Sequence, residues 1–201
     1  MLDIMLTGVG GQGTVLAAKV LAQASQERGW RTRTAETIGM AQRGGSVVSH
    51  VRMGNNGEEV YSSLIPYGLV DLIIAFEPAE AARVLPYLAP GGALVTASHG
   101  VQPVTAALSA QPYEADAMLE KIRRYFAEEP EKLTIVDETG LMKQVGSRKV
   151  LNTILLAKAL QTGQLPLGID DLKEAIRICV KPAFVDLNLA AVDVAVGGAA
   201  E

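Results

Sequence analysis

Residues 2–35, LDIMLTGVGGQGTVLAAKVLAQASQERGWRTRTA, decide the fold. Leu2–Leu6 is a short apolar run, and a glycine-rich turn follows it at residues 8–13. Thr14–Arg28 has the apolar spacing of a helix, and the alternating sequence Trp-Arg-Thr-Arg-Thr-Ala at 30–35 indicates a strand. This opening predicts a β-turn-α-β unit, which is the usual start of an α/β domain.

The rest of the chain continues the alternation of strands and helices. We expect strands at residues 46–53, 58–64, 69–76, 93–96 and 133–136, and helices from Pro78 and at 117–128, 148–160, 171–179 and 183–196. The turn residues 54–57, Gly-Asn-Asn-Gly, suit a hairpin that pairs 58–64 with 46–53. Asp116 and Asp170 are expected helix caps. The predicted fold is a single three-layer α/β/α, Rossmann-like domain, whose mostly parallel sheet becomes mixed through this antiparallel hairpin.

Composition narrows the class of protein. Of the 201 residues, 49% are hydrophobic and 20% are charged, as in a folded domain, and the net charge of −4 gives no basic field for nucleic acid. Asp3 stands where a secretion signal has Lys or Arg, and prolines interrupt the longest uncharged stretch, 84–113. We therefore expect a cytoplasmic protein with neither a membrane segment nor a nucleic-acid partner.

Cysteine and histidine usage excludes several kinds of site. Cys179 is the only cysteine, so this chain can neither close an internal disulfide nor supply four thiolates to an iron–sulfur cluster. The two histidines, His50 and His99, are not at metal-ligand spacing, so no metal site is predicted. The sequence has no G-x-S-x-G nucleophile motif, and it assigns no catalytic residue.

The glycine-rich turn fits G-x-G-x-x-G between a strand and a helix, where dinucleotide-binding proteins hold a pyrophosphate. Free N–H groups at a helix start attract anions, so the candidate cofactor-binding residues are Gly8, Gly10, Gly11, Gln12, Gly13 and Thr14. The alternative is a turn that only packs the helix on the sheet. A dinucleotide site also requires an acid after the second strand, and Glu36 is the candidate.

A second group of candidates follows the second strand. Arg43 lies beside two glycines, so its guanidinium and bare backbone amides could together contact a phosphate, a carboxylate or a partner protein. The candidate substrate or partner loop is Gln42, Arg43, Gly44, Gly45 and Ser46. In the alternative reading, Arg43 only holds its own loop. His50 and Arg52 share one face of the expected strand, where they lie either at an interface or substrate site or, as the alternative, serve the structure. His99 follows a strand end, where it is either a ligand contact or a solvated loop residue.

The turn 8–13, followed by 43–46 and a strand that ends at Arg52, resembles the gamma-type subunits of 2-oxoacid:ferredoxin oxidoreductases. Asn152 and Asn188 extend this resemblance, so that residues 1–201 read as one pyruvate/ketoisovalerate oxidoreductase gamma-type domain. The segment 39–45, GMAQRGG, is most similar to the indolepyruvate type, although Ile38 stands where that type is expected to have histidine.

The resemblance implies a complex that oxidatively decarboxylates a 2-oxoacid to an acyl-CoA and reduces ferredoxin. This sequence has no Gly-Asp-Gly start of a thiamine diphosphate motif and lacks the cysteines for iron–sulfur clusters. Both cofactors are therefore expected on a larger partner subunit of a hetero-oligomer, with coenzyme A as a candidate ligand at the interface and no firmly bound cofactor on this chain. The alternatives are a free-standing NAD or FAD oxidoreductase, a purely structural subunit, and pyruvate, 2-oxoglutarate or ketoisovalerate as the 2-oxoacid.

Overall fold

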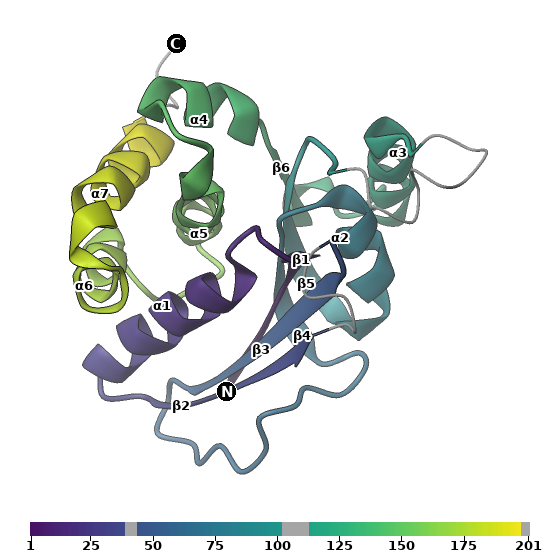
Figure 1. The fold of residues 1–201 in the computed structure, drawn as a ribbon. Helices are drawn as coiled ribbons and strands as arrows, with labels where there is room; N and C mark the ends of the chain where they lie inside the picture. The colour runs from purple at the N-terminus through teal and green to yellow at the C-terminus, as the bar shows by residue number, and fades with distance from the viewer. Residues whose placement is uncertain (39–43, 102–112, 198–201) are drawn as a thin grey trace.

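The computed structural model describes residues 1–38, 44–101 and 113–197. A six-stranded sheet in the order β2-β3-β1-β4-β5-β6 forms its centre (Figure 1). The strands β1, β4, β5 and β6 are parallel neighbours, whereas β3 is antiparallel to both β1 and β2. Their bounds are β1 Leu2–Val9, β2 Arg31–Ile38, β3 Ser46–Gly54, β4 Val70–Ala75, β5 Leu88–Ala97 and β6 Leu133–Val136.

Helices cover both faces of the sheet, which confirms the predicted three-layer α/β/α arrangement (Figure 1). One face carries α1 Thr14–Glu27, α4 Glu138–Val145, α5 Leu151–Gln161, α6 Ile169–Cys179 and α7 Pro182–Gly197, and the other carries α2 Pro78–Val84 and α3 Ala115–Tyr125. Short 3-10 turns are η1 Leu85–Tyr87, η3 Pro130–Lys132 and η4 Arg148–Val150. Among the described helices, none is long and apolar enough to cross a membrane.

The strand β1 is buried on both sides because it lies between the two helical layers. Ile4 and Leu6 are fully buried in the core under α1 and α5, and Met5, between them, is fully buried in the core under α2 and α3. This explains why β1 is a continuous apolar run rather than an alternating one. The helix α5 has most of its residues buried, since it packs on the sheet and also against α1, α4 and α7.

The predicted hairpin between 46–53 and 58–64 is wrong. β3 already has β1 on one side and β2 on the other, so it has no free edge for a third partner. The segment instead runs irregularly and is held by side chains: Arg52 Nη1 donates to the carbonyls of Ser62 and Leu64 at 3.3 and 3.2 Å, and Arg33 Nε donates to that of Val60. The sheet is mixed because β3 is antiparallel to its two neighbours.

Two helix starts also differ from the prediction. The helix α3 begins at Ala115, and Asp116 lies in its first turn rather than capping it. The helix α6 begins at Ile169, and its N-cap is Gly168, whose N–H donates to the Asp171 side chain at 2.7 Å. The helix α4, which begins after Asp137, was not predicted.

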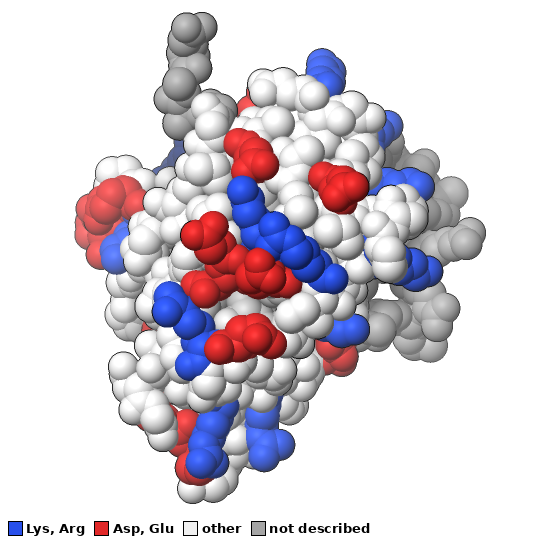
Figure 2. Space-filling model, turned by 90° about the vertical axis from the view of Figure 1, so that its left-hand side faces the viewer, with Lys and Arg blue, Asp and Glu red and all other residues white. Residues whose placement is uncertain are grey.

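The face that carries α6 and α7 shows interleaved acidic and basic side chains (Figure 2). Ion pairs cross from element to element there: Lys173 contacts Asp193 at 2.5 Å, and Arg28 contacts Asp171 at 3.2 Å. Exposed pairs of this kind contribute little to stability and keep a surface solvated. On this face we find no single-sign field that would attract a polyanion.

Arg52→Ala is expected to lower the free energy of unfolding by roughly 3 kcal/mol, because it removes the cation paired with a buried carboxylate. Arg52 Nε and Nη2 donate to the two Asp3 carboxylate oxygens at 2.8 and 2.9 Å, and Asp3 is only 6% exposed. Urea unfolding followed by circular dichroism measures the loss. Arg177→Ala, which breaks an exposed pair with Glu174, is the control, with an expected change within about 0.5 kcal/mol. Equal losses in the two variants would contradict the prediction.

Candidate functional site

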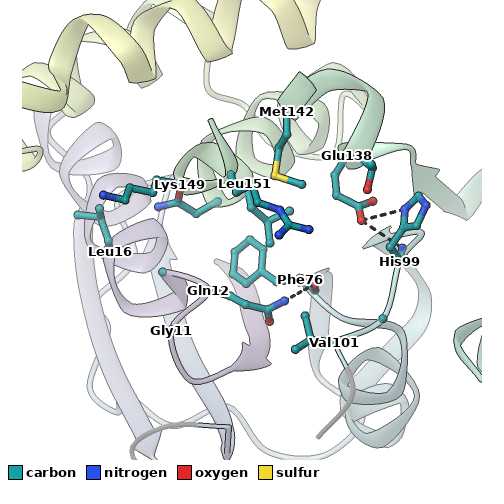
Figure 3. A pocket seen from close by; sticks show the side chains of 15 residues that line it. Gly11, Gln12, Leu16, Phe76, His99, Val101, Glu138, Met142, Lys149 and Leu151 are labelled. Carbon is teal, nitrogen blue, oxygen red and sulfur yellow. Dashed lines mark hydrogen bonds and ion pairs between the residues drawn. The ribbon is translucent and has the colours of Figure 1, made fainter. Parts of the chain in front are cut away.

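A cavity of about 580 Å³ lies at the carboxyl ends of β1, β4 and β5, on the side of α4 and α5 (Figure 3). Open α/β sheets commonly bind ligands at this edge. The turn after β1, the residue after β4 and the residues after β5 meet α4, η4 and α5 there. Its lining includes Gly11, Gln12, Gly13, Phe76, His99, Glu138, Arg148, Lys149 and Asn152.

The charges in the cavity wall favour an anion. Arg148 and Lys149 both line it, and within the described residues neither makes an ion pair. The Lys149 ammonium lies 5.6 Å from the centre of the Phe184 ring. Glu138, the acidic residue of this wall, is buried, and its carboxylate accepts hydrogen bonds from the Ser98 and His99 N–H groups. An anionic ligand would therefore meet two cations without an intervening counter-ion.

Gln12 holds the glycine-rich turn together. Its Oε1 accepts from the Val9 N–H at 2.7 Å, and its Nε2 donates to the Phe76 carbonyl at 2.9 Å. Gly8 makes room for this side chain, because a Cβ at Gly8 would lie 2.7 Å from Gln12 Oε1 and 3.0 Å from Phe76 Cβ. Gln12 therefore ties the end of β1 to the end of β4, and its amide is committed to this link.

The turn leaves fewer free N–H groups than its motif predicts. The Gly10 N–H donates to the Gly45 carbonyl at 2.8 Å, so it is not free for a ligand. Gly11 and Gly13 have left-handed φ values of +106° and +83°, and their N–H groups have no acceptor among the described residues. Thr14 begins α1, and its buried hydroxyl lacks a hydrogen-bond partner within the same set. Gly11 and Gly13 line the cavity, so their N–H groups are the turn's candidate anion donors.

The candidate loop is only partly described. Gln42 and Arg43 lie outside the described residues. Gly44 has a φ of +76°, the Gly45 carbonyl accepts from Gly10, and Ser46 Oγ donates to the buried Glu80 carboxylate at 2.6 Å. The described half of the loop therefore connects the glycine-rich turn to α2.

The sheet order does not fit a dinucleotide site. In dinucleotide-binding folds the second strand lies beside the first, which brings its terminal acid to the ribose. Here β3 separates β1 from β2, so Glu36 lies one strand farther away, a displacement of about 5 Å. Glu36 is exposed and pairs in register with Ser49 of β3 rather than with β1.

His50 and Arg52 both serve the fold. His50 is 5% exposed, and its Nδ1 accepts from the Ile65 N–H at 3.3 Å. Burial, and secondarily the nearby Arg52 charge, lower the pKa of His50. Arg52 pairs with Asp3, so both side chains fasten the segment 55–69 to the sheet.

The two asparagines of the resemblance are buried packing residues. A Cβ at Gly13 would lie 3.0 Å from Asn152 Nδ2, so Gly13 and Asn152 set how closely α1 approaches α5. Asn188 Oδ1 accepts from the Thr153 hydroxyl at 2.5 Å and joins α7 to α5. Among the described residues, no group of three His, Cys, Asp or Glu side chains forms a metal site.

Sequence reasoning missed the three charged residues of the cavity wall, Glu138, Arg148 and Lys149. Glu138 begins α4, a helix that was not predicted. The signal for the cations was present, because Arg148 and Lys149 open a helical segment, where the helix dipole disfavours positive charge. His99 was one of two open interpretations, a ligand contact or a solvated loop residue, and the structure places it in the wall opposite the glycine-rich turn (Figure 3).

Comparison with known proteins identifies the family. Residues 3–197 match the family model described as pyruvate ferredoxin/flavodoxin oxidoreductase. The chain belongs to this family. It is 38% identical over 200 residues, 99% of this chain and 96% of the other, to the indolepyruvate oxidoreductase subunit IorB of Pyrococcus horikoshii. It is 25% identical over 96% of its length to the pyruvate/ketoisovalerate oxidoreductases common subunit gamma of Thermococcus kodakarensis, covering 94% of that protein.

Solved structures share the fold of this oxidoreductase-family chain. The gamma subunit of a keto/oxoacid ferredoxin oxidoreductase from Geobacter sulfurreducens superposes with a TM-score of 0.68 at 22% identity, over 99% of this chain and 98% of that one. A 2-oxoglutarate:ferredoxin oxidoreductase from Magnetococcus marinus, solved with 2-oxoglutarate, coenzyme A and succinyl-CoA bound, superposes with a TM-score of 0.69 at 20% identity. In that case 98% of this chain matches 30% of the other. The family resemblance predicted from the sequence is confirmed.

Gly13→Ala is expected to destabilise the protein more than Gly29→Ala. Both glycines have left-handed φ values, +83° and +75°, which cost a residue with a side chain about 1 to 2 kcal/mol. A Cβ at Gly13 also meets Asn152, whereas one at Gly29 meets nothing within 4 Å. Thermal unfolding of the two variants measures the difference, which should shrink when Asn152→Ala is added to each. Equal losses in the single variants would show that the Asn152 contact is not tight.

Lowering the pH from about 7 to about 5 is expected to destabilise the wild-type protein more than His50→Gln. A lowered His50 pKa means that the unfolded chain takes up the proton first, so this contribution to stability is lost as the pH falls. The raised pKa values of Asp71 and Glu77, due first to burial, act in the opposite direction in both proteins. Urea unfolding gives the free energy of unfolding of each protein at the two pH values. The His50 contribution is the difference between the two proteins in the loss of this free energy from pH 7 to pH 5. Equal losses would contradict the prediction.

Proposed function

We propose that this chain is the small subunit of an indolepyruvate:ferredoxin oxidoreductase, with residues 1–201 forming one gamma-type domain. The observation that carries the proposal is the 38% identity over 99% of the chain to an indolepyruvate oxidoreductase subunit, against 25% to a subunit shared by pyruvate and ketoisovalerate oxidoreductases. The complex would convert an aryl pyruvate and coenzyme A to the acyl-CoA and carbon dioxide, and pass the electrons to ferredoxin.

The chain requires a larger partner for this activity. One cysteine cannot hold an iron–sulfur cluster, and the described residues offer no metal site. Thiamine diphosphate on the partner would supply the decarboxylation, and the partner's iron–sulfur clusters would carry the electrons. The match to 30% of the longer Magnetococcus chain supports a fold that works when joined to a larger protein. We expect this hetero-oligomer in the cytoplasm.

Coenzyme A is the ligand that best suits the cavity. Its phosphate groups match a wall that offers Arg148, Lys149 and the N–H groups of Gly11 and Gly13. The volume of about 580 Å³ accommodates part of such a molecule, and the remainder would extend toward the partner. The loop 42–46 connects to the same turn through the Gly10–Gly45 hydrogen bond, so we assign it to the interface that shapes this ligand's approach.

A purely structural subunit is the second candidate. The internal hydrogen bonds of Gln12 and Gly10 favour it, because they use polar groups that the motif would otherwise present to a ligand. The two readings differ in whether the cavity contributes to coenzyme A binding.

The subunit proposal is tested by anaerobic purification of the tagged chain from its own host. We expect a larger, brown partner to co-purify and the mixture to reduce a viologen dye with indolepyruvate and coenzyme A. Pyruvate and 2-oxoglutarate, run in parallel, test the substrate. A colourless chain that elutes alone would overturn the proposal, and faster reduction with pyruvate would transfer it to another 2-oxoacid.

Arg148→Ala and Lys149→Ala are each expected to raise the KM for coenzyme A roughly tenfold in the assembled enzyme, because a hydrogen bond to a charged group contributes about 1.5 to 3 kcal/mol. The KM for the 2-oxoacid and the native mass of the complex should stay unchanged. Lys143→Ala is the matched control, an exposed lysine of the neighbouring helix α4 that does not line this cavity. An unchanged KM for coenzyme A in both variants would favour the structural reading.

A further inference from the structure

One cluster of titratable side chains has no role in the proposal above. Ser98 and His99 follow β5, and Glu138 begins α4. Glu138 is 3% exposed, yet its carboxylate accepts from the Ser98 N–H at 2.8 Å, from the Ser98 hydroxyl at 3.2 Å and from the His99 N–H at 3.2 Å. These bonds hold the carboxylate in a fixed orientation at the cavity wall.

The imidazole of His99 is held by the same carboxylate. His99 Nδ1 lies 3.1 Å from Glu138 Oε1 and 2.8 Å from Ser98 Oγ, while the side chain is 59% exposed and lines the cavity (Figure 3). A carboxylate can only accept, so the contact with Glu138 is a hydrogen bond when the hydrogen lies on Nδ1. Ring nitrogen Nε2 has no partner among the described residues.

This cluster is not a nucleophilic triad, although it contains a serine, a histidine and an acid. In such a triad the serine and the acid contact opposite ring nitrogens, so that one nitrogen takes the serine proton while the other is held. Here Ser98 and Glu138 both contact Nδ1. With the hydrogen on Nδ1, these contacts orient the ring and leave Nε2 available to a ligand.

We propose that His99 is an anion-binding side chain of the cavity, that Glu138 is its positioning residue, and that binding of a phosphate- or sulfate-bearing group is coupled to protonation of the imidazole. The inference rests on the proposed anion site. Within that site, an imidazolium between the Glu138 carboxylate and the ligand's anionic group would be stabilised from both sides.

The other charges near His99 come from two directions. Across the cavity stand the cations Arg148 and Lys149 of η4. On the side of α3, a second hollow that His99 also lines contains Glu114, Asp116 and Arg123. A bound anion would offset the cations, and this favours the protonated form of His99. The affinity for the anion should therefore fall as the pH rises through the range in which histidine loses its charge, about pH 5 to 8.

The chain's two histidines make the test direct. In the full chain labelled with nitrogen-15 at histidine, we expect His99 to show the Nδ1–H tautomer in its neutral form. His50, whose Nδ1 accepts from Ile65, should show the Nε2–H tautomer and serves as the internal reference. Glu138→Gln should shift His99 toward the mixture of tautomers seen in free histidine and leave the His50 signals in place. A neutral His99 already in the Nε2–H form in the wild type would overturn the positioning role.

Inorganic sulfate, which does not titrate in this range, is the probe for coupling. Saturating sulfate should raise the midpoint of the His99 titration by about one pH unit, equivalent to about tenfold tighter binding by the imidazolium. The shift should be lost in a protein that carries both Arg148→Ala and Lys149→Ala. Isothermal titration calorimetry of the same proteins with sulfate reports binding independently of His99. If sulfate binds to the wild type but leaves the His99 midpoint in place, the coupling is wrong and the anion site stands. If calorimetry detects no binding and the midpoint does not move, both are wrong.

In the assembled enzyme, His99→Gln should raise the KM for coenzyme A about tenfold at pH 6 and much less at pH 8, with kcat unchanged. A merely structural role for His99 would instead change kcat and the native mass at both pH values. That outcome, or an equal rise in KM at both pH values, would overturn the coupling.

Discussion

The close contact between the ends of β1 and β4 is the constraint on which the functional edge of this molecule depends. Gly8, Gln12 and Phe76 meet there, with the Gln12 side chain bonded to both strands. This contact fixes where the glycine-rich turn leaves the sheet, and therefore where α1 begins. A side chain at Gly8 would push Gln12 or Phe76 aside and move the start of α1 relative to β5 and α4. The cavity exists because these elements keep their spacing.

The insertion of β3 between β1 and β2 changes what a familiar motif can do. The turn and helix retain the dinucleotide-binding pattern, but the partner acid is displaced and the Gly10 N–H bonds to the Gly45 carbonyl after the second strand. The positive end of the α1 dipole still faces the cavity, and Arg148 and Lys149 of η4 add two cations to the same wall. The result is a wall suited to a phosphate or another anion, with little provision for a ribose or a nicotinamide.

Much of this architecture follows from local sequence signals. Continuous apolar runs gave β1, β4 and β6, helical spacing gave α1 and α5, and glycine-rich turns separated them. The failures have a common physical cause, which is that strand pairing is a long-range property. The residues 54–57 are a good turn, yet the strand before them had already found partners on both sides, so the turn could not make a hairpin. Likewise, Gln12 is compatible with the motif in sequence. Only its hydrogen bond to the carbonyl of Phe76, 64 residues later in the chain, shows that it links two strand ends.

The site was harder to predict than the fold because its charges come from distant parts of the chain. The turn at 8–13 and His99 could be named as separate candidates from the sequence. Glu138 and Arg148 become candidates only because the fold places α4 and η4 at the ends of β5 and β1. Position also separates two histidines that look alike in sequence. His50 lies on a strand inside the sheet, where burial disfavours its charge, while His99 lies beyond a strand end beside a carboxylate. In the proposed complex, where the redox cofactors would belong to the partner, such placement of charge at an anionic ligand is the contribution that we propose for this fold.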